Sequence, residues 1–156
     1  MNPSDFRAAL SRFASGVTII TARDAKGRDV GMTVSAFSSL SLEPPLVLAC
    51  VDDTASVAPV LAQCEHFAVN ILAADQSELS RRFARQDVDR FEGIDLTRGV
   101  EGLPLLSGAL AQLSCAVEAR HPGGDHTILV GRVLEVETRD ANPLLYFRGA
   151  YGEYRR

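Results

Sequence analysis

The sequence has little of several things that would restrict its function. It has no tryptophan, two methionines and three cysteines among 156 residues. The cysteines, Cys50, Cys64 and Cys115, are odd in number and form no C-x-x-C pair, so we expect neither a disulfide framework nor a metal site. No run of about 18 apolar residues occurs, so we expect no membrane-spanning segment. No basic start precedes an apolar block, so we expect no signal peptide and a cytoplasmic protein with reduced thiols.

Positive charge and phosphate-binding motifs are also scarce. The chain has 16 Lys and Arg against 20 Asp and Glu, and its pI is about 5.3. Proteins that bind nucleic acids are usually basic, so we expect no nucleic-acid partner. The motifs G-x-x-x-x-G-K-S/T and G-x-G-x-x-G are missing, so a bound nucleotide would need another kind of site. At this length we expect one domain, residues 1–156, that holds its core without cross-links.

What is present is a series of β-branched and apolar runs separated by turns. These runs predict strands at residues 17–21, 30–38, 46–51, 66–72, 110–120, 127–138 and 144–147. The run at 46–51 is apolar throughout, which is typical of a strand buried on both faces. Three short helices are predicted between the strands. They run from a Ser4 cap to Gly16, from Asp53 or Thr54 to Leu61, and from Asp75, in a capping box with Glu78, across Leu79 and Phe83.

The order of these elements predicts the architecture. It contains no regular βαβ alternation, so a parallel doubly wound sheet is excluded. Turns at residues 24–27 and 122–125 join neighbouring strands into hairpins, and Pro44-Pro45 breaks the chain. Residues 86–104 are expected to form an irregular surface loop. Because long hairpins must hide their edges, we predict a mostly β (α+β) fold, a closed antiparallel β-barrel with a few short peripheral helices.

Four segments contain residues suited to chemistry. Residues 31–39 are rich in small and hydroxyl side chains, against which a flat ring can lie. Residues 52–56 place hydroxyls after a buried strand, residues 81–85 contain three arginines, and residues 123–126 form a glycine turn that ends in His126. Each segment alone has an ordinary structural interpretation: a solvated strand face, a helix cap, a charged helix face and a hairpin turn with a structural histidine.

Together, in this order, the segments resemble the short-chain flavin reductase family, the reductase components of two-component flavin-dependent monooxygenases. The resemblance rests on residues 13–18, on the strand and proline turn at 31–47, on 66–72, on the Gly-Asp-His block at 124–133, and on 143–151. It covers nearly the whole chain. Two places depart from it. Many relatives have a basic residue where Asp53 stands, and residues 86–102 match no pattern.

The resemblance implies a homodimeric FMN-binding split barrel that reduces FMN, or FAD, with NADH or NADPH and supplies reduced flavin to a separate oxygenase. It implies that His126 faces the nicotinamide and that Tyr151 closes the pocket. Thr33, Val34, Ser35 and Ala36 would line the ring edge. The remaining flavin contacts that it implies are Ser38, Ser39, Cys50, Val51, Asp52, Ser56, and Arg82 or Phe83.

Other functions remain compatible with the sequence. A flavin-binding electron carrier that does not turn over NAD(P)H is the main alternative. The others are oxidation of pyridoxamine phosphate, reduction of a bound non-flavin substrate such as a corrinoid or a quinone, and a structural dimer without a ligand. Loss of absorbance at 340 nm when FMN meets the protein and NADH would distinguish a reductase from a carrier.

Overall fold

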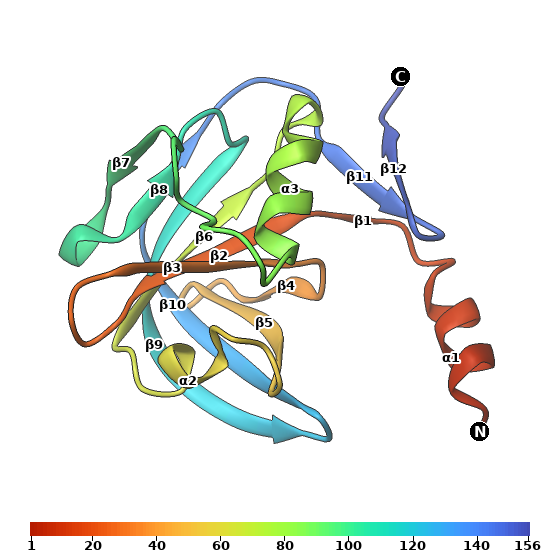
Figure 1. The fold of residues 1–156 in the computed structure, drawn as a ribbon, viewed down its shortest axis with the longest axis horizontal. Helices are drawn as coiled ribbons and strands as arrows, with labels where there is room; N and C mark the ends of the chain where they lie inside the picture. Colours follow the sequence, from red (N-terminus) through yellow and green to blue (C-terminus); the bar gives the residue numbers. More distant parts are fainter.

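The computed structural model describes residues 1–156, and the chain is mostly β-structure. Its main element is a seven-stranded antiparallel sheet in the order β3-β2-β6-β9-β10-β5-β4 (Figure 1). The strands of this sheet are β2 (Thr18–Arg23), β3 (Asp29–Val34), β4 (Phe37–Ser41), β5 (Leu46–Asp52), β6 (His66–Ile71), β9 (Ala111–Gly123) and β10 (His126–Thr138).

Two predicted hairpins organise the sheet. In the turn between β2 and β3, the Asp24 carboxylate accepts the backbone N–H groups of Lys26 and Arg28 at 2.9 Å each. Gly27 has a φ of 75° there, a conformation that favours glycine. The β9–β10 hairpin turns at Gly124, whose φ is 72°. The turn chemistry therefore places both hairpins where the sequence predicts them.

The predicted closed barrel is wrong, because the two edge strands of the sheet, β3 and β4, do not pair with each other. The expected strand at 30–38 is broken at Ser35 and Ala36, and β4 pairs with β5 instead, Phe37 opposite Ala49. Two residues can span only about 7 Å. The edges of the curled sheet therefore approach one another here, joined by the chain and not by a ladder of hydrogen bonds.

The sheet has an inner and an outer face. The inner face holds the main apolar core, with Ile20, Phe67, Cys115 and Leu129 at its centre. The outer face is covered in part by helix α3 (Ser77–Ala84), which follows the 3-10 turn η1 (Ala74–Gln76), and Phe83 of α3 is fully buried. A two-stranded sheet, β7 (Leu96–Arg98) and β8 (Pro104–Leu106), with the 3-10 turn η2 (Val100–Gly102) between its strands, completes this cover. Residues 86–104 are therefore more ordered than predicted.

A second, three-stranded sheet lies apart from the main one. It consists of β1 (Ser15–Gly16), β11 (Leu144–Phe147) and β12 (Ala150–Glu153), in the order β1-β11-β12. Helix α1 (Pro3–Leu10) lies next to this sheet at one side of the molecule (Figure 1). We call α1 and this sheet the arm. Its helix carries no buried residue, and its last strand, β12, has no counterpart in the sequence prediction.

Several local predictions are corrected by the structure. Asn2, not Ser4, caps α1, and that helix ends at Leu10 well before Gly16. Strand β5 alternates between buried and half-buried residues, so only one of its faces is in the core. The expected helix that ends at Leu61 is only the short α2 (Ala58–Leu61), with no side-chain cap. The predicted capping box is replaced by the Gln76 side chain, which accepts the Ala73 N–H.

No helix of the structure is long and apolar enough to cross a membrane. Cys115 is buried, whereas Cys50 and Cys64 are half-buried. Burial raises the pKa of the Cys115 thiol to about 12.

Candidate active site

The outer face of β4, β5 and β10 brings together segments that are far apart in the sequence. His126 of β10 is paired with Asp52 of β5, and Ile128 is paired with Cys50. Residues paired in an antiparallel sheet share a face, and residues two apart on one strand share it too. His126, Asp52 and Cys50 therefore lie on one face, and β4 adds Ser38, which is paired with Leu48. We call this surface the open face.

The break between β3 and β4 leaves two backbone donors without a partner. Ser35 and Ala36 are exposed, and neither N–H donates a hydrogen bond within the protein. The Ala36 carbonyl does accept the Cys50 N–H at 2.9 Å, which ties the break to the open face. Neighbouring N–H groups that point to solvent can bind a carbonyl or another electron-rich edge. This edge of the open face can therefore hold a planar ligand with polar atoms on its rim.

The hairpin that carries His126 is fixed to the loop after β5. The Asp53 N–H donates to the Asp125 carbonyl at 3.0 Å, and the Thr127 hydroxyl donates to the Asp53 carboxylate at 2.7 Å. His126 Nδ1 lies 2.7 Å from the Asp125 carboxylate, and 40% of the His126 side chain is exposed. The imidazole is therefore oriented through Nδ1, which leaves Nε2 for a ligand.

Asp52 beside it is held as a carboxylate. Its oxygen Oδ1 accepts the Thr54 hydroxyl at 2.7 Å and the Thr54 N–H at 2.8 Å. These bonds, the one from the hydroxyl first, lower the pKa of Asp52, and nearby His126 lowers it further, against a smaller opposing effect of burial. The open face therefore carries negative charge next to the imidazole.

Thr33 and Tyr151 meet at helix α3. The Thr33 hydroxyl donates to the Ser80 carbonyl at 2.6 Å, and the Ser80 hydroxyl shares a hydrogen bond of 2.7 Å with the Tyr151 hydroxyl. Thr33 is paired with Ile19 on β2, whose side chain packs in the cluster under α3. Thr33 therefore belongs to the same outer face as Cys50 and Asp52.

Several predicted residues are placed elsewhere. Val34 and Val51 are buried in the inner core, so only their backbone atoms can reach a ligand on the open face. Phe83 is fully buried under Gly31, where a Cβ would come within 2.9 Å of its ring. Ser39 is exposed, but it is paired with the core residue Val47 and so points away from Ser38.

Arg82 is also not directed toward the open face. Its guanidinium donates to the carbonyls of Asp89 at 2.7 Å and Glu92 at 2.5 Å, and its Nε is buried without a partner. The side chain therefore holds the loop after α3. The sequence shows three arginines at residues 81–85, but it does not show which way each of them points.

The structure adds two candidate residues that the sequence missed, Gln86 and Arg90, beside the predicted Ser56. Ser56 lies in a pocket of about 240 Å³ with Gln86 and Arg90, between the start of β3 and the loop after α3. Arg90 donates to the carbonyls of Gly31 and Arg85 at 2.6 Å each, which fixes its guanidinium there. Ser56, Gln86 and Arg90 provide donors for an anion, although Asp89 and Asp29, the latter bound to Arg98, also line the pocket. The only signal in the sequence was a basic residue in an unassigned loop.

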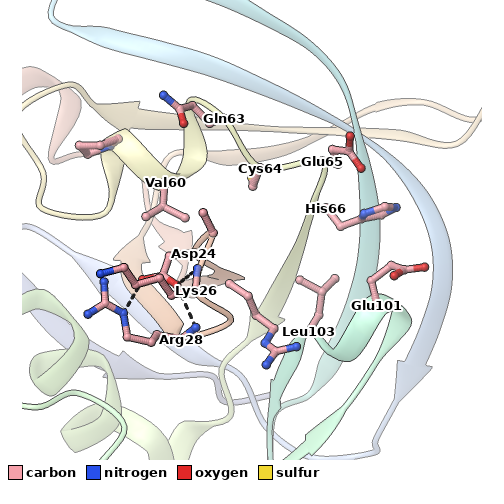
Figure 2. A pocket seen from close by; sticks show the side chains of 13 residues that line it. Asp24, Lys26, Arg28, Val60, Gln63, Cys64, Glu65, His66, Glu101 and Leu103 are labelled. Carbon is pink, nitrogen blue, oxygen red and sulfur yellow. Dashed lines mark hydrogen bonds and ion pairs between the residues drawn. The ribbon is translucent and has the colours of Figure 1, made fainter.

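Another pocket, of about 680 Å³, lies away from the open face and contains none of the predicted residues (Figure 2). It lies between the β2–β3 turn, the end of α2, the start of β6 and the turn before β8. Acidic and basic side chains alternate around it, and Arg28 is bound to Asp24 at 2.7 Å. Burial raises the pKa of Cys64 in its wall, despite the opposing effect of Arg120. This pocket is a gap between loops, and the positive and negative side chains that line it balance one another.

Comparison with known proteins identifies the family of the chain. The family model described as "Flavin reductase like domain" matches residues 10–155. The chain belongs to this family, and it is an oxidoreductase of the flavin reductase class. The resemblance identified from the sequence is thus confirmed.

Individual relatives agree over almost the full chain. The FMN reductase (NADH) SmoA of Agrobacterium fabrum is 43% identical over 99% of this chain and 88% of its own length. The reductase subunit HsaB of a flavin-dependent monooxygenase from Rhodococcus jostii is 43% identical over 97% and 77%. The crystal structure of the NADH:FAD oxidoreductase of Streptomyces globisporus, in complex with NAD and FAD fragments, matches with a TM-score of 0.93 and 36% identity over 99% and 96%.

Proposed function

We propose that this chain transfers a hydride from NADH to FMN and releases the reduced flavin to a separate oxygenase component. The observation that carries this proposal is the unpaired pair of N–H groups at Ser35 and Ala36, on the same open face as His126. A bound flavin supplies the electron-accepting ring, and the nicotinamide supplies the hydride. The protein then needs to bind and align two flat rings, and it needs no base of its own.

The residues of the open face suit this alignment. The N–H groups of Ser35 and Ala36 would hold the electron-rich edge of the flavin, and the small side chains Ser38 and Cys50 would leave room for the ring. His126, held by Asp125, would position the nicotinamide above it. We therefore assign His126 to recognition of the nucleotide and not to proton transfer.

The charge around His126 supports NADH as the hydride donor. The carboxylates of Asp52 and Asp125 lie beside the imidazole, and residues 50–56 and 121–127 contain no Lys or Arg. A 2′-phosphate near this face would meet like charge. NADPH is expected to give a lower kcat/KM than NADH, and Asp52→Asn, which keeps an acceptor for Thr54, should reduce the difference. Equal kcat/KM values for the two nucleotides in the unchanged protein would contradict this charge argument.

The pocket of Ser56, Gln86 and Arg90 supports a flavin that carries a phosphate, such as FMN. An Arg side chain fixed by two carbonyls, with a hydroxyl and an amide beside it, suits the terminal phosphate of FMN. FAD carries a phosphate at the same position, so this pocket favours FMN and FAD alike over riboflavin. Arg90→Gln should raise the KM for FMN more than that for riboflavin, which has no phosphate.

Exposed apolar side chains support a homodimer. Phe6 and Leu10 of α1 are each 55% exposed, and Leu134 and Val136 of β10 are 44% and 55% exposed. A second copy that covers these residues would bury them. Light scattering on a size-exclusion column should give twice the chain mass of 16.8 kDa, and Leu10→Asp with Val136→Asp should give the monomer mass.

The decisive assay follows absorbance at 340 nm. The purified chain with NADH and FMN should consume NADH, and it should do so far more slowly when flavin is left out. No consumption with NADH or NADPH, while FMN binds, would favour an electron carrier and overturn the proposed function. Addition of a flavin-dependent oxygenase should couple that consumption to product formation without a stable complex between the two proteins.

A further inference from the structure

Helix α3 contains a buried hydroxyl with an unusual partner. Ser80 has no exposed surface, although it lies in the middle of the helix. A buried serine in a helix normally bonds back to the carbonyl four residues earlier. The Ser80 hydroxyl instead bonds to the hydroxyl of Tyr151, which is 71 residues further along the chain. It therefore serves a contact between the main body and the arm.

The same residue is bonded to β3, which the proposed function places beside the flavin and which we call the flavin strand. The Ser80 carbonyl accepts the hydroxyl of Thr33 at 2.6 Å. One residue of α3 thus fixes Thr33 of β3 on one side and Tyr151 of β12 on the other. Because the Thr33 hydrogen is used in this bond, its oxygen can only accept from a ligand.

Tyr151 is held on further sides. The guanidinium carbon of Arg81 lies 4.9 Å from the centre of its ring, and the ring of Tyr146 lies 5.7 Å from it. Tyr151 is only half-buried, so part of its ring remains available to a ligand. The Tyr151 hydroxyl is the atom that bonds to the main body, and Ser80 is its partner in that bond.

We infer that Ser80 is a positioning residue of the reductase site, which sets the distance between the flavin strand at Thr33 and the ring of Tyr151. This inference rests on the proposed function, because it takes the flavin to lie beside Thr33. Ser80 touches no ligand itself. It acts through the two residues that it holds, and a loss of its hydroxyl frees Tyr151 but leaves Thr33 bonded to the backbone.

The test is a double-mutant cycle with Ser80→Ala and Tyr151→Phe, which remove the same hydrogen bond from its two ends. Each variant should raise the KM for FMN, and the dissociation constant from quenching of flavin fluorescence, about three- to ten-fold. The kcat at saturating FMN should stay within about two-fold. The double variant should be no weaker than the weaker single variant, since only one bond is lost. Thr97→Ala, which removes an exposed hydroxyl that makes no hydrogen bond in the structure, should leave both constants unchanged.

A merely structural role gives a different pattern. It would lower the active fraction, and so kcat, with the KM unchanged, and this result would overturn the inference. Effects of the two single variants that multiply in the double variant would also overturn it. If Ser80→Ala does not fold, Tyr151→Phe alone decides, because it removes the bond without changing the helix. Wild-type protein that binds FMN but consumes no NADH would instead overturn the proposed function and leave the binding cycle measurable.

Discussion

The outer face of the seven-stranded sheet has a covered half and an open half. Polar groups have hydrogen-bond partners within the protein in the covered half, whereas two backbone donors of the open half have none. In the covered half, under β8, Asn70 is fully buried, donates to the Ile19 carbonyl at 3.0 Å and accepts the Leu106 N–H at 2.8 Å. In the open half, the N–H groups of Ser35 and Ala36 have no partner. Polar groups satisfied inside the protein contribute to stability, whereas unsatisfied ones at a surface are available to a ligand.

The largest effect should come from the covered half. Asn70→Ala leaves the Leu106 N–H without its partner in a dry site and opens a small cavity. We expect a loss of about 2–4 kcal/mol in the free energy of unfolding. Urea unfolding followed by circular dichroism measures it, and the melting temperature should fall by roughly 4–16 °C.

The matched control is Asn142→Ala, the same substitution at an exposed residue whose side chain makes no hydrogen bond in the structure. It should change stability by less than about 0.5 kcal/mol. The folded Asn70→Ala protein should retain its KM for NADH. A change in that KM at a temperature where the protein is folded would mean that the two halves are not separate in function.

The next largest effect should come from the open half, where a substitution should lower activity and leave stability unchanged. His126→Ala removes a half-exposed side chain whose only bond is to exposed Asp125. We expect kcat/KM for NADH to fall about 10- to 100-fold, while FMN binding and the melting temperature stay nearly unchanged. Stopped-flow reduction of FMN by NADH measures the step directly.

His121→Ala is the control for this prediction. His121 is exposed and paired with Ile128, so it lies on the same face one step away from His126. It should have little effect on NADH kinetics. Equal losses in both variants would show that the face needs positive charge or bulk in general, and His126 would lose its specific role.

The division between the halves also explains what the sequence could and could not predict. The strands predicted at 17–21 and 110–120 depend on local pattern, and β2 and β9 cover most of these two runs. Strands β7 and β8 have three residues each and are held by Asn70 and by Thr21, which donates to the Pro104 carbonyl. No pattern within 96–106 signals bonds to residues so far away.

The site shows the same limit. The residue types at 31–39 and 124–126 indicated a binding site. The two segments come together because β5 lies between β10 and β4 in the sheet, and this strand order cannot be inferred from either segment. Side-chain direction was not predictable either: Arg82 points into the loop after α3, and Phe83 points into the core. The break at Ser35–Ala36, which was predicted as continuous strand, is the place where the unpaired N–H groups lie.

A smaller effect should report whether flavin covers the open face. Cys50 is half-buried on that face, whereas Cys115 is fully buried and burial raises its pKa to about 12. With iodoacetamide at pH 8, we expect Cys50 to react in the native protein and Cys115 to react only after unfolding. Saturating FMN should slow alkylation of Cys50 at least about five-fold, as measured by peptide mass spectrometry, and leave the slow reaction of Cys64 unchanged. An unchanged Cys50 rate with FMN bound would place the flavin elsewhere.

The smallest effect should be the pH dependence that Asp52 gives to stability. Hydrogen bonds from Thr54 lower the pKa of its carboxyl in the folded state, and His126 adds to this. Because the folded pKa lies below the unfolded one, the carboxylate stabilises the fold above the unfolded pKa, about 3.9, and this stabilisation is lost as the pH falls through the folded pKa. In Asp52→Asn the melting temperature should therefore fall less steeply between pH 5 and pH 3. Asp24→Asn, which removes another carboxyl of lowered pKa far from the open face, should flatten the curve in the same way without changing the KM for NADH. If Asp52→Asn instead leaves the slope unchanged, the Thr54 bonds do not persist in solution, and the negative charge beside His126 is not held in place by them.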